Sequence, residues 1–132
     1  MKPNAYLFDT HALIFWVNKV SVSDKFIAFF DSQAQQDALH VSTITFWEIA
    51  LLVQKGRLAI PDIHAWQHEL FSQTNLRLLH PSVSDMINST LLPPHHKDPF
   101  DRLLIAQAKA NDLTFVTQDQ MIQAYDVPQI WL

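Results

Sequence analysis

Short, continuous apolar runs alternate along the chain with longer segments in which apolar residues recur every three or four positions. The short runs are typical of strands buried on both faces of a sheet, and the longer segments are typical of helices. The pattern predicts strands over residues 5–9, 39–42, 76–79, 114–117 and 129–132. It predicts helices over residues 10–18, 23–36, 43–55, 61–73, 82–91 and 99–111, and a short helix from residue 119.

Strands that alternate with helices favour an α/β fold, in which a parallel sheet is flanked by helices on both faces to give three layers. The chain has 132 residues, of which 48% are apolar, so a single domain over residues 1–132 can bury a sizeable core. In sheets of this kind, functional side chains gather at the carboxyl ends of the strands. The residues that directly follow strands are therefore the first candidates for a site.

Composition removes several classes of chemistry. A single glycine, Gly56, excludes glycine-rich phosphate loops and dinucleotide fingerprints, which need several glycines at fixed spacing. The absence of cysteine excludes thiol catalysis, cysteine-ligated metals and disulfides, and makes the cytosol the default compartment. The net charge is −4, so bulk electrostatics alone would not bind nucleic acid. The longest apolar run, Ala12–Val17, is far too short for a membrane span.

Four carboxylates occupy positions where a site is expected. Asp9 and Asp119 follow the first and fourth strands, while Glu48 and Asp101 lie in helices next to the second and fourth strands. Capping a helix is an alternative role for Asp9 and Asp119, and the helix dipole favours Asp101 in a first turn. Glu48 lies in mid-helix, where eight of the ten residues Ile44–Val53 are apolar, so capping does not explain it. A solvated helix face is the structural alternative for Glu48.

In one parallel sheet, all four carboxylates could meet at the same carboxyl edge. Like charges packed together repel strongly, so such a cluster needs a cation. Oxygen ligands without cysteine favour Mg²⁺ or Mn²⁺. These ions activate water and neutralise the charge on a phosphate, so the cluster points to phosphate chemistry.

Four segments resemble motifs of the PIN-domain family, and they occur in the expected order. They are Leu7–Leu13 around the first carboxylate, Phe46–Ala50 around the second, His96–Ala108 around the third and Phe115–Asp119 around the fourth. The third segment is the most specific, and the match extends over about the whole chain. Within that family, the chain resembles the VapC-type toxins of bacterial type II toxin–antitoxin pairs.

The resemblance implies a PIN-like domain that acts as a metal-dependent endoribonuclease, with RNA such as transfer RNA as its substrate. It implies a catalytic pocket that holds Mg²⁺ or Mn²⁺ and consists of Asp9, Glu48, Asp101 and Asp119. Two matching hydroxyls would support this pocket, those of Thr10 and Thr117. The family also implies a homodimer, a cognate antitoxin protein that blocks the site, and a location in the bacterial cytoplasm.

Basic side chains beside the third motif are candidates to hold the RNA backbone. We expect Arg102 and Lys97 to do so, with ordinary solvated charge as the alternative for each. Asp98 matches no acidic position of the family, and we expect it to cap the following helix. We expect His95 and His96 to be exposed loop residues rather than ligands.

Two other functions fit parts of the pattern. A catalytically silent PIN-fold binding module would keep the fold, although the presence of all four acids argues against decay of a site. A metal-dependent phosphatase with Asp9 as nucleophile is the second alternative. Haloacid-dehalogenase-like enzymes need another Asp two residues later, where this chain has His11. Metal-dependent cleavage of RNA by the purified protein separates these functions.

Overall fold

The computed structural model describes residues 4–132, and its elements confirm the expected α/β fold. A 3-10 helix, η1, takes the place of the expected last helix. In chain order the elements are β1 (Tyr6–Phe8), α1 (Thr10–Asn18), α2 (Asp24–Gln35), β2 (Leu39–Ser42), α3 (Thr43–Gln54), α4 (Ile63–Gln73), β3 (Arg77–Leu79), α5 (Val83–Leu91), α6 (Pro99–Ala110), β4 (Thr114–Val116), η1 (Gln120–Ala124) and β5 (Gln129–Ile130).

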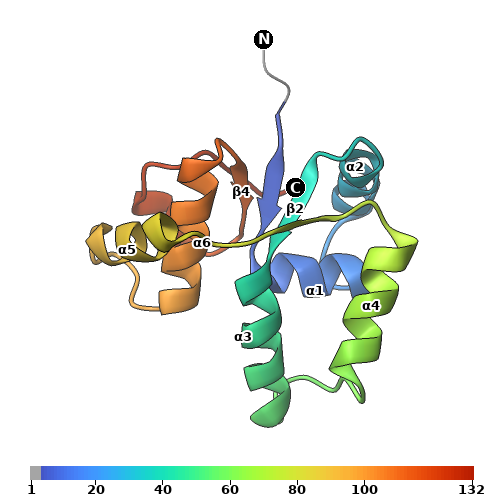
Figure 1. Ribbon diagram of the computed structural model, residues 1–132. Helices are drawn as coiled ribbons and strands as arrows, with labels where there is room; N and C mark the ends of the chain where they lie inside the picture. The colour runs from blue at the N-terminus through green and yellow to red at the C-terminus, as the bar shows by residue number, and fades with distance from the viewer. Residues whose placement is uncertain (1–3) are drawn as a thin grey trace.

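The five strands form one parallel sheet in the order β3-β2-β1-β4-β5. Helices α5 and α6 lie on one side of this sheet, and α2 and α4 lie on the other (Figure 1). The central strand β1 pairs with β2 on one side and with β4 on the other. From β1 the chain adds β2 and β3 on one side of the sheet and then β4 and β5 on the other, so the order switches sides at β1. Sites in open α/β sheets lie at the carboxyl ends of the strands next to such a switch, here β1, β2 and β4.

Side chains of β1 alternate between the two faces of the sheet. Tyr6 and Phe8 pack into the core on one face, and Leu7 packs into the core on the other. This alternation is the two-residue period of a strand. Phe8 lies against two aromatic rings of α2, with ring centroids 6.1 Å from Phe26 and 5.1 Å from Phe30. Each such side chain contributes about 1.5–3 kcal/mol through burial, so this cluster anchors β1 firmly.

One expectation about the strands is wrong. Burial on both faces does not extend to β3, where Arg77 and Leu78 are exposed. The physical reason is position, because β3 is an edge strand with a single neighbour, β2. The strand also begins one residue later than expected, since the buried Leu76 takes no part in the pairing.

Caps set the helix starts and therefore place the residues that follow the strands. The side chain of Asp9 caps α1, that of Ser42 caps α3 and that of Asp98 caps α6. Gly56 follows the end of α3 with a φ of 73°, a left-handed conformation that favours glycine. Within residues 4–132, no helix combines the length and the apolar character that crossing a membrane requires.

Candidate active site

The four predicted carboxylates line one pocket at the carboxyl edge of the sheet. Asp9 follows β1 and Asp119 lies just beyond β4, while Glu48 belongs to α3 and Asp101 to the first turn of α6. The pocket has a volume of about 410 Å³. Its lining residues are Asp9, His11, Phe15, Glu48, His96, Asp98, Asp101, Gln118 and Asp119. The structure thus brings together carboxylates from four separate segments of the chain.

Asp9 is buried and is held at both its backbone and its side chain. Its backbone N–H donates to the carbonyl oxygen of Val116 at 3.1 Å, next to the pairing of β1 with β4. Its carboxylate accepts a 2.7 Å hydrogen bond from the N–H of Ala12, which makes it the N-cap of α1. Burial raises the pKa of Asp9, and hydrogen bonds from Ala12 and Thr117 oppose that rise. Asp9 is therefore both a helix cap and a wall of the pocket.

Glu48 lies half-buried at the pocket and has a hydroxyl of α1 as its partner. Thr10 Oγ1 donates a 2.6 Å hydrogen bond to Glu48 Oε1, and Thr45 Oγ1 lies 3.4 Å from Thr10 Oγ1. Burial raises the pKa of Glu48, and the bond from Thr10 partly offsets the rise. Glu48 is thus a pocket residue with a buried partner rather than part of a solvated helix face.

Asp101 does not remain ionised at neutral pH within this cluster. Burial, followed by the negative charges of Asp98, Asp9, Glu48 and Asp119, raises its pKa to about 8. The carboxyl group therefore holds a proton at pH 7 when no cation is present. A cation in the pocket would reverse this, because positive charge offsets the repulsion between the carboxylates.

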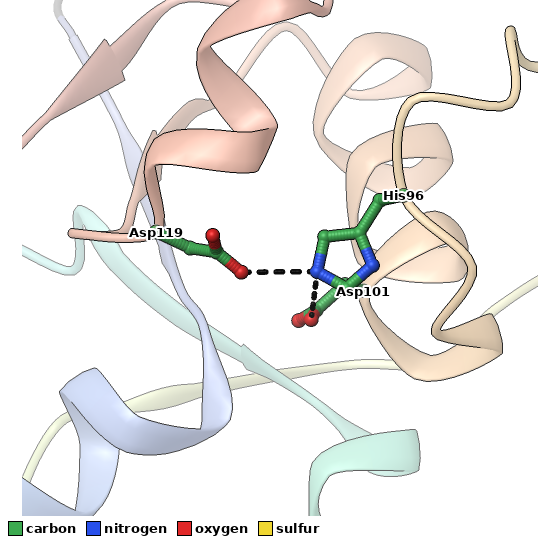
Figure 2. A group of neighbouring side chains, drawn as sticks. All are labelled: His96, Asp101 and Asp119. Atoms are coloured by element: carbon green, nitrogen blue, oxygen red, sulfur yellow. Dashed lines mark hydrogen bonds and ion pairs between the residues drawn. The ribbon is translucent and has the colours of Figure 1, made fainter.

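A histidine expected in an exposed loop lies between two of the carboxylates. Nε2 of His96 is 2.9 Å from Oδ2 of Asp119 and 3.2 Å from Oδ2 of Asp101 (Figure 2). The side chain of His96 is 12% exposed, so the expectation of an exposed residue is wrong. The neighbouring His95 is exposed as expected. The sequence feature that could have indicated a place for His96 in the pocket is its position at the start of the third motif.

The two hydroxyls expected to support the pocket contact its carboxylates. Thr10 donates to Glu48, as described above, and is buried. Thr117 is also buried; it hydrogen-bonds Asp9, and its Oγ1 accepts a 3.1 Å bond from the backbone N–H of Asp119. A supporting role of both hydroxyls in activity stays a prediction.

Arg102 points to the proline-rich loop before α6. Its Nη1 donates to the carbonyl oxygens of Pro93 and His96 at 3.0 and 3.1 Å. Its Nη2 donates to the carbonyl oxygen of Leu92 at 2.8 Å. The guanidinium therefore holds this loop, and a contact of Arg102 with an RNA backbone stays a prediction.

Lys97 and Asp98 continue the same loop toward α6. Lys97 is exposed, and its contact with RNA stays a prediction. Asp98 accepts a 2.9 Å bond from the N–H of Phe100 and caps α6, as expected. Asp98 also lines the pocket, and its charge raises the pKa of Asp101. The pocket therefore contains a fifth carboxylate, which the sequence identified only as a cap.

The donor set fits a hard divalent cation. Five carboxylates line the pocket, and the pKa values of three of them, Asp9, Glu48 and Asp101, are raised. Carboxylate oxygens are the protein ligands that suit Mg²⁺ and Mn²⁺. Among the described residues, His96, Asp101 and Asp119 each offer one potential ligand atom, and these atoms lie within 4.8 Å of one another.

Comparison with known proteins identifies the family of this chain. Residues 6–128 match the model of the PIN domain family. Ribonuclease VapC22 of Mycobacterium tuberculosis is 30% identical to this chain in an alignment of 128 residues that covers 93% of this chain and 93% of that protein.

Two solved structures share the fold. One is VapBC2 from Rickettsia felis, solved bound to a DNA fragment from the VapBC2 promoter. It aligns with a TM-score of 0.72 at 18% identity, over 97% of this chain and 99% of that chain. FitAcB from Neisseria gonorrhoeae aligns with a TM-score of 0.66 at 23% identity, over 95% of this chain and 96% of that chain. With a family match over nearly its whole length and the four acidic motifs gathered in one pocket, this chain belongs to the PIN domain family.

Proposed function

We propose that this protein is a metal-dependent endoribonuclease and the toxin of a toxin–antitoxin pair. The observation that carries the proposal is the pocket in which Asp9, Glu48, Asp101 and Asp119 meet at the carboxyl edge of the sheet. The similarity to VapC22, which is named a ribonuclease, supports the same activity.

Mg²⁺ or Mn²⁺ is the cofactor that we propose, with Asp9, Glu48, Asp101 and Asp119 as the residues that hold it. Such an ion, when bound, supplies an activated water and neutralises charge on the scissile phosphate. The raised pKa values of Asp9, Glu48 and Asp101 support this proposal. They indicate that the pocket needs more positive charge than the protein itself provides.

The residues of the chain hold the pocket oxygens in place. Ala12 and Thr117 fix the carboxylate of Asp9, and Thr10 fixes that of Glu48. Asp101 releases its proton when positive charge enters the pocket, since its raised pKa depends on burial and on neighbouring negative charges. Electrostatic groups arranged before the substrate arrives need no reorganisation during the reaction.

Two aromatic rings at the pocket support a nucleic-acid substrate. His11 and Phe15 both line it, and their ring centroids are 6.1 Å apart. Unstacked bases of RNA loops and single strands bind to aromatic side chains in this way. Together with the family resemblance, this favours a structured RNA with exposed loops, such as transfer RNA. Lys97 is the basic residue that we propose to contact the RNA backbone.

We infer two protein partners. A cognate antitoxin that covers the pocket is supported by the structural similarity to VapBC2, a complex solved on promoter DNA. A second copy of this chain is supported by the apolar side chains that α5 exposes, among them Val83 at 74% and Ile87 at 56%. The bacterial cytoplasm, where RNA and an antitoxin would meet this protein, is the location that we propose.

Cleavage of RNA by the purified protein, freed of any bound partner, tests the proposed function. The reactions contain Mg²⁺ or Mn²⁺, or a chelator, and run beside the Asp9→Asn variant. We expect cleavage that needs the cation and disappears in the variant. Asn is also a good N-cap, so the free energy of unfolding of the variant should lie within about 1 kcal/mol of that of the unchanged protein.

Three other outcomes would contradict the proposal. No cleavage of any RNA by folded protein with Mn²⁺ present would favour a binding module. Cleavage in the presence of chelator would refute the metal dependence. Hydrolysis of small phosphate esters without cleavage of RNA would favour the phosphatase.

A further inference from the structure

Both ring nitrogens of His96 have hydrogen-bonding partners. Nδ1 lies 3.0 Å from the backbone nitrogen of Asp98, whose N–H donates to it. Nε2 faces the carboxylates of Asp101 and Asp119 (Figure 2). A backbone N–H is always a donor, so Nδ1 must accept. In the neutral ring the hydrogen therefore lies on Nε2, which donates to Oδ2 of Asp119 at 2.9 Å and lies 3.2 Å from Oδ2 of Asp101.

This tautomer does not allow a bond from Nε2 to a metal. A ligating nitrogen offers its lone pair to the ion, and the other nitrogen then carries the hydrogen and donates it. In His96 the other nitrogen faces the N–H of Asp98, so two hydrogens would point at each other. The spacing of His96, Asp101 and Asp119 is that of a metal site, but the hydrogen bonding gives His96 a different role.

The backbone of His96 is fixed by two residues that do not line the pocket. Tyr125 Oη accepts a 2.9 Å hydrogen bond from the N–H of His96 and donates one of 2.6 Å to the carbonyl oxygen of Pro93. Arg102 donates to the carbonyl oxygen of His96 at 3.1 Å. Both peptide groups next to His96 are therefore anchored, and the ring is held between the carboxylates.

We propose that His96 is a positioning residue, whose Nε2–H holds Asp101 and Asp119 in the arrangement that a divalent cation requires, and that Arg102 and Tyr125 act through it. The proposal rests on the proposed function in that it takes the pocket to be a metal site. The two side chains come from separate segments of the chain, α6 and the residues after β4. Because Nε2 of His96 contacts both side chains, it holds the two segments together at the pocket before an ion arrives.

The tautomer of His96 is the first measurement. Long-range ¹H–¹⁵N correlation spectra of the imidazole rings distinguish Nε2–H, Nδ1–H and doubly protonated histidine. The signals of His96 are assigned by their loss in the His96→Gln variant. We expect the Nε2–H form in the full-length protein with chelator, and the same form after addition of Mg²⁺. Either of the other two forms, or a shift of Nε2 to the position of a coordinated nitrogen, would overturn the proposal.

Affinity for Mn²⁺, measured by calorimetric titration, is the second test. Mutation of a residue that orients metal ligands typically weakens metal affinity about 10–100-fold, so His96→Leu should bind Mn²⁺ at least about tenfold more weakly. His96→Gln keeps an N–H donor, so its affinity for Mn²⁺ should stay close to that of the unchanged protein and well above that of His96→Leu. His95→Leu is the matched control, because His95 belongs to the same loop and packs on Tyr125 at 5.2 Å between ring centroids. It should bind Mn²⁺ normally.

The outcomes of the titration separate a positioning role from a merely structural one. Unchanged Mn²⁺ affinity in His96→Leu, or an equal loss in the Leu and Gln variants, would refute the positioning role. Thermal melting checks that each variant folds. If His96→Leu does not fold, the ring spectra of the unchanged protein and the His96→Gln titration still decide.

These measurements also keep this proposal apart from the proposed function. The ring spectra and the Mn²⁺ titration need no RNA, so they can succeed even where no RNA is cleaved. Conversely, normal metal-dependent cleavage by His96→Leu with unchanged Mn²⁺ affinity would refute the positioning role and leave the ribonuclease intact.

Discussion

Thr10 and Glu48 are joined by a 2.6 Å hydrogen bond that links the start of α1 to the middle of α3. Thr10 directly follows Asp9, so one turn of chain fixes one pocket carboxylate and donates to another. Thr10 is 2% exposed, which keeps water from replacing the bond. The bond lowers the pKa of Glu48 against the upward effect of burial.

Thr10→Val should therefore shift the pH profile of RNA cleavage to higher pH. Loss of the bond raises the pKa of Glu48 further, and only the ionised carboxylate binds a cation well. A hydrogen bond worth about 1.5 kcal/mol corresponds to a shift of about one pH unit. Thr10→Ser keeps the hydroxyl and should retain the original profile. Identical profiles for the Val and Ser variants would contradict the role of this bond.

Binding of Mn²⁺ should release a proton from Asp101. The pKa of this group is about 8 without a cation, so it is protonated at neutral pH and must ionise to bind the ion. Affinity should then rise about tenfold per pH unit below that pKa. Calorimetric titration in buffers of different ionisation enthalpy counts the released protons. Affinity that is independent of pH between about 6 and 7.5 would contradict this assignment.

The stability of the protein in chelator should fall as pH rises. The pKa of Asp101 is raised from 3.8 to about 8 in the folded state, so the folded protein binds more protons across this window. The free energy of unfolding therefore decreases as pH rises toward 8. Asp101→Asn removes this charge and should gain about 1–2 kcal/mol at pH 8 while losing activity. Urea unfolding at pH 5 and pH 8 checks both statements, and a variant less stable than the unchanged protein at pH 8 would contradict them.

Arg102→Lys should reduce the free energy of unfolding. A lysine cannot reproduce the fork of donors that reaches the carbonyl oxygens of Leu92, Pro93 and His96. The carbonyl oxygen of Pro93 keeps the hydroxyl of Tyr125, but those of Leu92 and His96 lose this donor, at a cost of about 1–3 kcal/mol. Urea unfolding measures the loss. If stability is unchanged and the salt dependence of RNA binding weakens instead, Arg102 contacts RNA rather than the loop.

Lys97→Ala, unlike Arg102→Lys, should affect RNA binding rather than stability. Lys97 is exposed, so its removal should change stability by less than about 0.5 kcal/mol. If it contacts an RNA phosphate, the variant should raise KM with little change in kcat, and the slope of log affinity against log salt should fall by about one. Binding measured at several salt concentrations provides the check, and an unchanged slope would leave Lys97 as ordinary solvated charge.

The sequence by itself determined the elements and the carboxylates of the site. Helix starts are local events, and the side chains of Asp9 and Asp98 cap helices at positions where the sequence offers such a cap. The alternation of strands and helices leads to a parallel sheet, and a parallel sheet brings residues that follow its strands to one edge. For this reason the order of strands and helices along the chain is enough to place Asp9 and Asp119 at the same edge.

Only the tertiary structure decided the surroundings of those carboxylates. The position of His96 depends on a bond to Tyr125, 29 residues further along the chain, and no local pattern encodes that contact. The same holds for Arg102, whose donors reach back to carbonyl oxygens of the preceding loop, and for the exposure of β3, which depends on its place at the edge of the sheet. Such contacts form only when segments distant in sequence pack together, because loop conformation and strand order are set by long-range packing rather than by periodicity.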